Sequence, residues 1–304
     1  MGTLFSTATL LLTLALSFLI SSNNLSVCIG PIISARLLTS REATVLAIIG
    51  FTFGLLVEGH RMSFVQLPPD RTVIVLSVTL IVVLLGELLR VPISLMYVLS
   101  TGLSTMYMFN HNMRPPHTFI LSVLYWLGSA LLVVIASPIT LRLFQRIGSS
   151  RPFRFVTIYR IVSVLTTFLL CVSFGANNLG LLWSISGHSL AIVPGIILAM
   201  LLGVLLTGKR TLEKLAGMYV LSPTACLTIT SVTFAASQIA TLLRIPVSFS
   251  VLLVCSLVGV SLAYHIRLID FKYAYRSLTV LFASIPLTML TLSILEALTH
   301  VLIS

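Results

Sequence analysis

Long stretches of the chain carry neither acidic nor basic residues, and these stretches define its architecture. Crossing the hydrocarbon core of a bilayer takes about 20 consecutive apolar residues in a helix. Several uncharged runs exceed this length, and together they cover 1–35, 72–86, 91–113, 115–141, 161–208, 215–243, 245–266 and 277–295. The pattern predicts an all-α polytopic membrane protein with about 10–12 membrane segments and almost no domain outside the bilayer.

Composition supports the same class. Hydrophobic residues make up 58% of the chain and charged residues 8%, whereas a soluble domain carries roughly 25% charged residues. Such a chain cannot cover itself with a polar surface, so we expect a multi-pass protein of the cell membrane with the lipid bilayer as its solvent. The net charge of +11 reflects the Lys and Arg that gather in cytoplasmic loops, and does not indicate a nucleic-acid partner.

The chain contains an internal duplication. The adjacent amides Asn23 and Asn24 in "LISSNNLS" recur as Asn177 and Asn178 in "SFGANNLG", 154 positions later. The segment "ELLRVPIS" at 87–94 recurs as "TLLRIPVS" at 241–248, again 154 positions later. Two motif pairs at one spacing predict two membrane repeats, 1–148 and 149–304.

Both motifs combine features that interrupt a membrane helix. Proline removes a backbone donor, and irregular backbone at membrane depth is tolerated where protein or a water-filled cavity covers it. Inverted repeats with broken helices bind substrate at the repeat interface in many secondary transporters. Helix N-termini, Ser hydroxyls and Asn amides suit an oxyanion, although the same oxygens could hold Na⁺.

These residues resemble the inorganic phosphate transporter (PiT) family of anion permeases. The family segment G-A-N-D-V-A-N-A-x-G-P is similar to "SSNNLSVCIGP" at 21–31 and to "GANNLG" at 175–180. The family segment P-V-S-T-T-H is similar to "PISLMY" at 92–97 and "PVSFSV" at 246–251. The resemblance implies two inverted-topology repeats with re-entrant helices, ion-coupled uptake of phosphate or sulfate, and a possible homodimer.

The resemblance also supplies candidate site residues. Substrate contacts carry over to Asn23, Asn177, Ser94 and Ser248, with Ser22 and Gly175 beside the amides. The coupling ion, Na⁺ or H⁺, is assigned to Asn24, Asn178 and Ser250, and no other cofactor or metal is implied. The family Asp is Asn24 in one copy and Asn178 in the other, so two negative charges are missing from a cation site. The Thr-Thr-His triplets are also replaced.

Two arginines beside the prolines are further candidates. Intramembrane ionisable residues are functional candidates by default, and Arg90 and Arg244 occupy matching positions in the two copies. They either attract the anion or extend to the membrane interface. Glu296 is weighed in the same way, as a proton relay or as an interfacial residue.

The motifs favour a secondary active permease for an inorganic oxyanion, phosphate first. A sulfate permease of the same fold is the first alternative. A non-transporting membrane sensor derived from a permease is the second, because of the missing Asp and Thr-Thr-His residues. An enzyme is not expected, because the few ionisable residues are scattered along the chain.

Overall fold

The computed structural model describes residues 2–88, 93–110, 114–148, 152–208, 221–264 and 271–303, and within these ranges the regular structure is helical. The helices in the first half are α1 (Gly2–Ser34), α2 (Ser40–Val57), η1 (Gly59–Arg61), α3 (Pro69–Leu88), α4 (Leu95–Asn110) and α5 (His117–Gly148). Those in the second half are α6 (Pro152–Phe174), η2 (Gly175–Leu179), α7 (Gly180–Ile185), η3 (Leu190–Ile192), α8 (Val193–Leu206), α10 (Pro223–Leu242), α11 (Phe249–Tyr264) and α12 (Phe271–Ile303).

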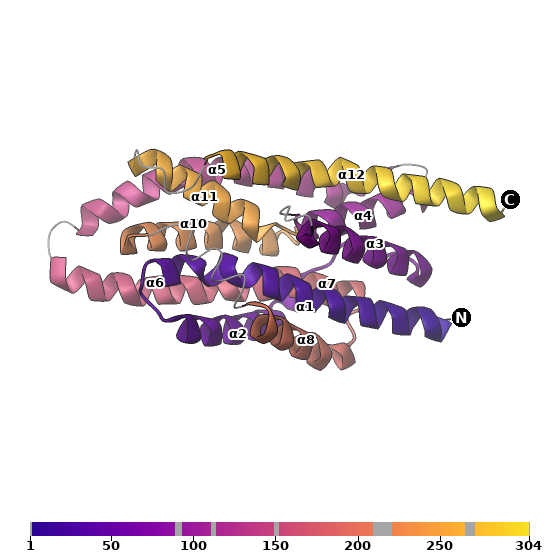
Figure 1. Ribbon diagram of the computed structural model, residues 1–304, viewed down its shortest axis with the longest axis horizontal. Helices are drawn as coiled ribbons and strands as arrows, with labels where there is room; N and C mark the ends of the chain where they lie inside the picture. The colour runs from indigo at the N-terminus through magenta and orange to yellow at the C-terminus, as the bar shows by residue number, and fades with distance from the viewer. Residues whose placement is uncertain are drawn as a thin grey trace.

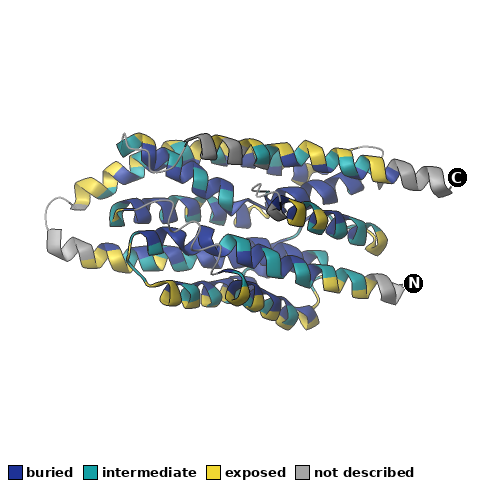
Figure 2. Ribbon diagram, viewed as in Figure 1, coloured by how far each residue is buried: buried dark blue, intermediate teal, exposed yellow. Residues whose placement is uncertain are grey.

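The helices are those of a multi-pass membrane protein. In the described part of the chain, six helices are long and apolar enough to cross a bilayer, and four shorter apolar helices accompany them. Their outward faces are apolar: Leu131 and Leu132 of α5, for example, are 64% and 66% exposed. Figure 2 shows the buried residues along the inner faces of the helices and the exposed ones on the outside. The predicted all-α polytopic membrane fold is confirmed.

Two helix pairs enter the bundle from opposite ends. Figure 1 shows α3 and α4 in the half that holds both chain termini, and α10 and α11 in the half where α5 meets α6. Helix α10 begins 154 positions after α3, and α11 begins 154 positions after α4. This is the spacing of the two sequence motifs. The proline-containing motif, at 87–94 and 241–248, lies at the join within each pair. Each pair forms a hairpin. The inverted, re-entrant topology of the two hairpins and the division into repeats 1–148 and 149–304 stay predictions.

Helices α2 and α6 cross at very short range because glycines face the crossing. A Cβ added to Gly54 would lie 1.9 Å from the Val172 carbonyl oxygen, and one added to Gly175 would lie 2.1 Å from the Phe51 carbonyl oxygen. Small residues let membrane helices approach closely, and van der Waals packing then replaces the hydrophobic driving force that is absent in lipid. This crossing fixes where the "GANN" segment lies.

We expect Gly54→Ala to destabilise the protein, because the added methyl group overlaps the α6 backbone. Overpacking of this kind costs about 1–3 kcal/mol in the free energy of unfolding, measured by denaturation in detergent. The matched control is Gly128→Ala in α5, because a Cβ at Gly128 meets no atom within 4 Å. Equal stability of the two variants would contradict the role given to the α2–α6 crossing.

Candidate functional site

The chain is irregular between α10 and α11, in the middle of the bundle. Arg244 adopts a left-handed conformation, with φ of 60°, and Pro246 follows in an extended segment. Backbone groups freed at membrane depth need partners within the protein, since no water is available there. The break therefore raises the question of what holds residues 245–247.

Two side chains from distant helices hold this break. The Nδ2 of Asn177 donates to the Ile245 carbonyl at 2.9 Å, and its Oδ1 accepts from the Val247 N–H at 3.1 Å. The Nε1 of Trp126 donates to the Pro246 carbonyl at 2.7 Å. Three successive residues of the break are thus bonded by side chains that lie outside it.

Asn177 faces α10 and the break. It is completely buried, and its Nδ2 also donates to Thr241 Oγ1 at 3.2 Å. It does not line the small pocket at the centre of the bundle, which Asn178 does line. Its predicted contact with substrate stays a prediction, and its geometry is that of a residue that positions the α10–α11 junction.

The neighbouring amide, Asn178, faces elsewhere because adjacent residues of a helix point in directions about 100° apart. Residues 175–179 form a single π-helical turn between α6 and α7, and such turns occur frequently at functional sites. Asn177 reaches the α10–α11 break from this turn, and Asn178 reaches a pocket on another side. The two adjacent asparagines therefore have different surroundings.

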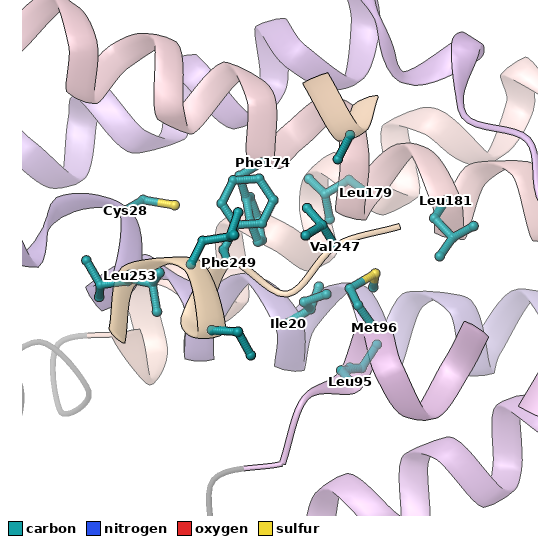
Figure 3. Close-up of a cluster of buried hydrophobic side chains, with 14 of the residues drawn as sticks. Ile20, Cys28, Leu95, Met96, Phe174, Leu179, Leu181, Val247, Phe249 and Leu253 are labelled. Atoms are coloured by element: carbon teal, nitrogen blue, oxygen red, sulfur yellow. The ribbon is translucent and has the colours of Figure 1, made fainter. Parts of the chain in front are cut away.

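A small pocket lies where the tips of the two hairpins meet α1 and η2. Its volume is about 40 Å³, several times the ~10–15 Å³ that one water needs. Polar residues from both motifs line it: Asn23, Asn24, Asn178, Ser94, Ser248 and Ser250. The apolar part of the wall is Ile20, Ile93, Leu95, Met96 and Phe249. Figure 3 shows Ile20, Met96 and Phe249 approaching this region from three different helices.

Two helix N-termini contribute to the pocket. Ser94 and Ser248 directly precede α4 and α11, and each accepts the first helical hydrogen bond, from Val98 and Leu252 respectively. The first two residues of both helices line the pocket. The first N–H groups of a helix have no intrahelical partner and carry the positive end of the dipole. This is a favourable setting for an anion.

All of the described residues that line the pocket have uncharged side chains. Asn24 donates through Nδ2 to the Ile20 carbonyl at 3.0 Å, and its Oδ1 accepts a long, 3.5 Å hydrogen bond from Ser250 Oγ. The pocket thus offers hydroxyl and amide groups without formal charge. In the described part of the chain, no group of three or more His, Cys, Asp or Glu residues could hold a metal ion.

Other predicted residues lie outside the pocket. Ser22 shares a 2.6 Å hydrogen bond with Thr207 at the end of α8, and Gly175 packs against the α2 backbone. Arg244 is exposed at the end of α10, and Arg90 lies outside the described residues. Glu296 forms a 2.8 Å ion pair with Arg71, which joins α12 to α3. The proposed substrate contacts of Ser22, Gly175 and the two arginines remain predictions, as does the proton-relay role weighed for Glu296.

Sequence reasoning missed three residues. Trp126 lies in a uniformly apolar stretch of α5, 120 positions from its acceptor, and no motif marks it. Thr241 could have been found, because it stands in the second motif at the position of Glu87 in the first. Met96 stands in "PISLMY" where the family motif has Thr-Thr-His, and a methionine there carries no signal of its place in the pocket wall.

We expect Trp126→Phe to lower the free energy of unfolding by about 1–3 kcal/mol, the cost of leaving a buried acceptor without its partner. The phenyl ring keeps the stacking on Tyr97, whose ring centroid lies 4.3 Å away. Trp183→Phe is the matched control, because Trp183 donates to the carbonyl of the exposed Ser189. In that variant, water can donate to the Ser189 carbonyl in place of the indole. Similar losses in the two variants, measured by denaturation in detergent, would contradict the proposed support of the break.

Comparisons with known proteins address the fold and the family. No protein-family profile matches the chain. A Methanocaldococcus jannaschii protein named "Putative phosphate permease" is 25% identical over 264 residues, which cover 86% of this chain and 87% of that protein. A solved structure titled "The sodium-dependent phosphate transporter" superposes with a TM-score of 0.77 at 13% identity, over 98% of this chain and 99% of that one.

Both relatives are named as transporters, which agrees with the expectation that the chain is not an enzyme. The structural likeness extends over 98% of this chain, and the sequence likeness extends over 86% of it. Together they confirm the predicted resemblance: the chain is similar in sequence to a protein named as a phosphate permease and shares the fold of a sodium-dependent phosphate transporter.

Proposed function

We propose that the chain is an ion-coupled permease that carries inorganic phosphate across the cell membrane. The observation that carries this proposal is the central pocket, where both copies of both motifs meet beneath two helix N-termini. The names of the two relatives support phosphate as the substrate.

The pocket suggests a division of labour between its polar groups. Ser94, Ser248 and Asn23 can donate hydrogen bonds to phosphate oxygens, from three different segments of the chain. Asn24 and Ser250, whose oxygens lie 3.5 Å apart, are the proposed ligands of the coupling ion. Hard cations prefer oxygen ligands of this kind.

A coupling cation has a physical role here. Burying a charge is costly unless it is paired, and the described lining of the pocket contains no charged side chain. A cation bound with the phosphate would offset part of its charge. Na⁺ is the first ion to test because the structural relative is titled sodium-dependent, and H⁺ is the second.

The test is uptake of radiolabelled phosphate and sulfate into proteoliposomes, with Na⁺ and pH gradients imposed separately. We expect saturable phosphate uptake driven by a Na⁺ gradient. Uptake driven by the pH gradient instead would identify H⁺, and not Na⁺, as the coupling ion. Preferred uptake of sulfate would favour the sulfate permease, and phosphate binding without flux would favour the sensor.

We expect Ser94→Ala and Ser248→Ala each to weaken phosphate uptake by about tenfold in KM or in rate, because each removes one hydrogen bond to the anion. The control is Ser293→Ala in α12, whose hydroxyl donates to the Met289 carbonyl of its own helix. Full uptake by both pocket variants, in folded protein, would contradict the site assignment.

A further inference from the structure

One oxygen in the pocket has no partner. The Oδ1 of Asn178 is buried and makes no hydrogen bond with any described residue, and Asn178 as a whole is 1% exposed. Asn178 also lines the pocket, so the residue that carries this unbonded acceptor lies beside the space that a ligand would occupy. A buried acceptor left unbonded is costly, so a ligand that donates a hydrogen bond to it binds more tightly.

The cause is a difference between the two halves of the pocket. In one half, the Oδ1 of Asn24 accepts from the Ser250 hydroxyl. The residues at the corresponding positions, 154 apart in each case, are Asn178 and Met96. Met96 also lines the pocket, but a thioether sulfur cannot donate a hydrogen bond. Methionine therefore stands where the other half has the donor.

The unpartnered oxygen restricts what can bind beside it. An amide oxygen accepts hydrogen bonds and never donates them, so it is satisfied by an O–H group or a cation. A hard cation prefers a cluster of oxygen ligands over a thioether, and Met96 makes this half the poorer one for a cation. An anion that carries a hydroxyl group fits this half better.

Phosphate and sulfate differ in this respect. At neutral pH inorganic phosphate keeps at least one proton and therefore has a P–OH group, whereas sulfate is fully ionised and offers acceptors alone. Sulfate would set one of its oxygens against the Asn178 oxygen, an acceptor against an acceptor. Sites that hydrogen-bond a substrate hydroxyl strongly reject analogues without it.

We propose that the Asn178 Oδ1 accepts the hydroxyl proton of hydrogen phosphate, which makes Asn178 a specificity-determining residue for protonated oxyanions. The inference rests on the proposed function, because it concerns the same pocket and substrate. It reassigns Asn178 from the coupling ion, where the family resemblance placed it, to the anion. The coupling ion keeps Asn24 and Ser250.

The sharpest probe is monofluorophosphate, in which fluorine replaces the phosphate hydroxyl. At mildly alkaline pH monofluorophosphate and hydrogen phosphate are both dianions of similar shape, so they differ chiefly in the donor. We measure how strongly unlabelled phosphate, monofluorophosphate and sulfate each inhibit radiolabelled phosphate uptake. In the wild-type protein we expect phosphate to inhibit at least about tenfold more strongly than monofluorophosphate, as the loss of one hydrogen bond predicts.

Two variants test the residue itself. Asn178→Leu removes the acceptor, and we expect phosphate and monofluorophosphate to become nearly equal inhibitors because phosphate binds more weakly. Met96→Ser places a hydroxyl where it can donate to Asn178, as Ser250 donates to Asn24. We expect this variant, with Asn178 intact, also to reduce the difference in inhibition between phosphate and monofluorophosphate. Ser293→Ala is the control and should keep the wild-type ratio. Each protein is first shown to be folded by its melting temperature in detergent.

The outcomes separate this inference from the proposed function. If the folded wild-type protein takes up no phosphate, the proposed function fails and the inference with it. If phosphate is taken up but monofluorophosphate inhibits as strongly as phosphate, the inference alone fails. A third outcome is that Asn178→Leu keeps the wild-type ratio of inhibition by phosphate to inhibition by monofluorophosphate while its Na⁺ dependence shifts. That result would assign Asn178 to the cation and also overturn the inference.

Discussion

A backbone N–H or carbonyl inside a membrane must find its partner within the protein, and the α10–α11 break depends on this constraint. Asn177 and Trp126 bond the backbone of residues 245–247. Without such partners the break would be too costly to form, and Ser248 could not begin a new helix at the centre of the bundle. The pocket wall includes non-helical backbone next to this break. That backbone is stable because Asn177 and Trp126 form hydrogen bonds with its N–H and carbonyl groups.

The chemistry of the pocket follows from its lack of formal charge. A fixed positive side chain would hold an anion by charge alone, and sulfate and phosphate would then compete on similar terms. Neutral hydroxyls, amides and helix N-termini instead bind through the number and direction of hydrogen bonds. In the proposed function, a neutral site leaves the charge of the bound anion to be offset by a cation.

Motifs that recur 154 positions apart give the pocket related but unequal halves. Asn24 and Asn178 occupy matching positions and both line the pocket, yet Asn24 accepts a hydrogen bond from Ser250, whereas Met96 stands at the position that matches Ser250. The amide at the preceding matched position also differs: Asn23 lines the pocket and Asn177 bonds the break. A repeated sequence therefore supplies the frame, and single substitutions within it give each half its own role.

The sequence by itself determined the class of protein, the helical content, the 154-residue spacing and the polar residues of the pocket. These follow from hydropathy and from repeated motifs, which are local or can be compared along the chain. It could not determine which of two adjacent asparagines faces the pocket, because that depends on how the helical segment 175–179 packs against the α10–α11 junction. Nor could it reveal Trp126, since an indole in an apolar helix finds its acceptor 120 positions away only when the tertiary fold brings α5 beside the break.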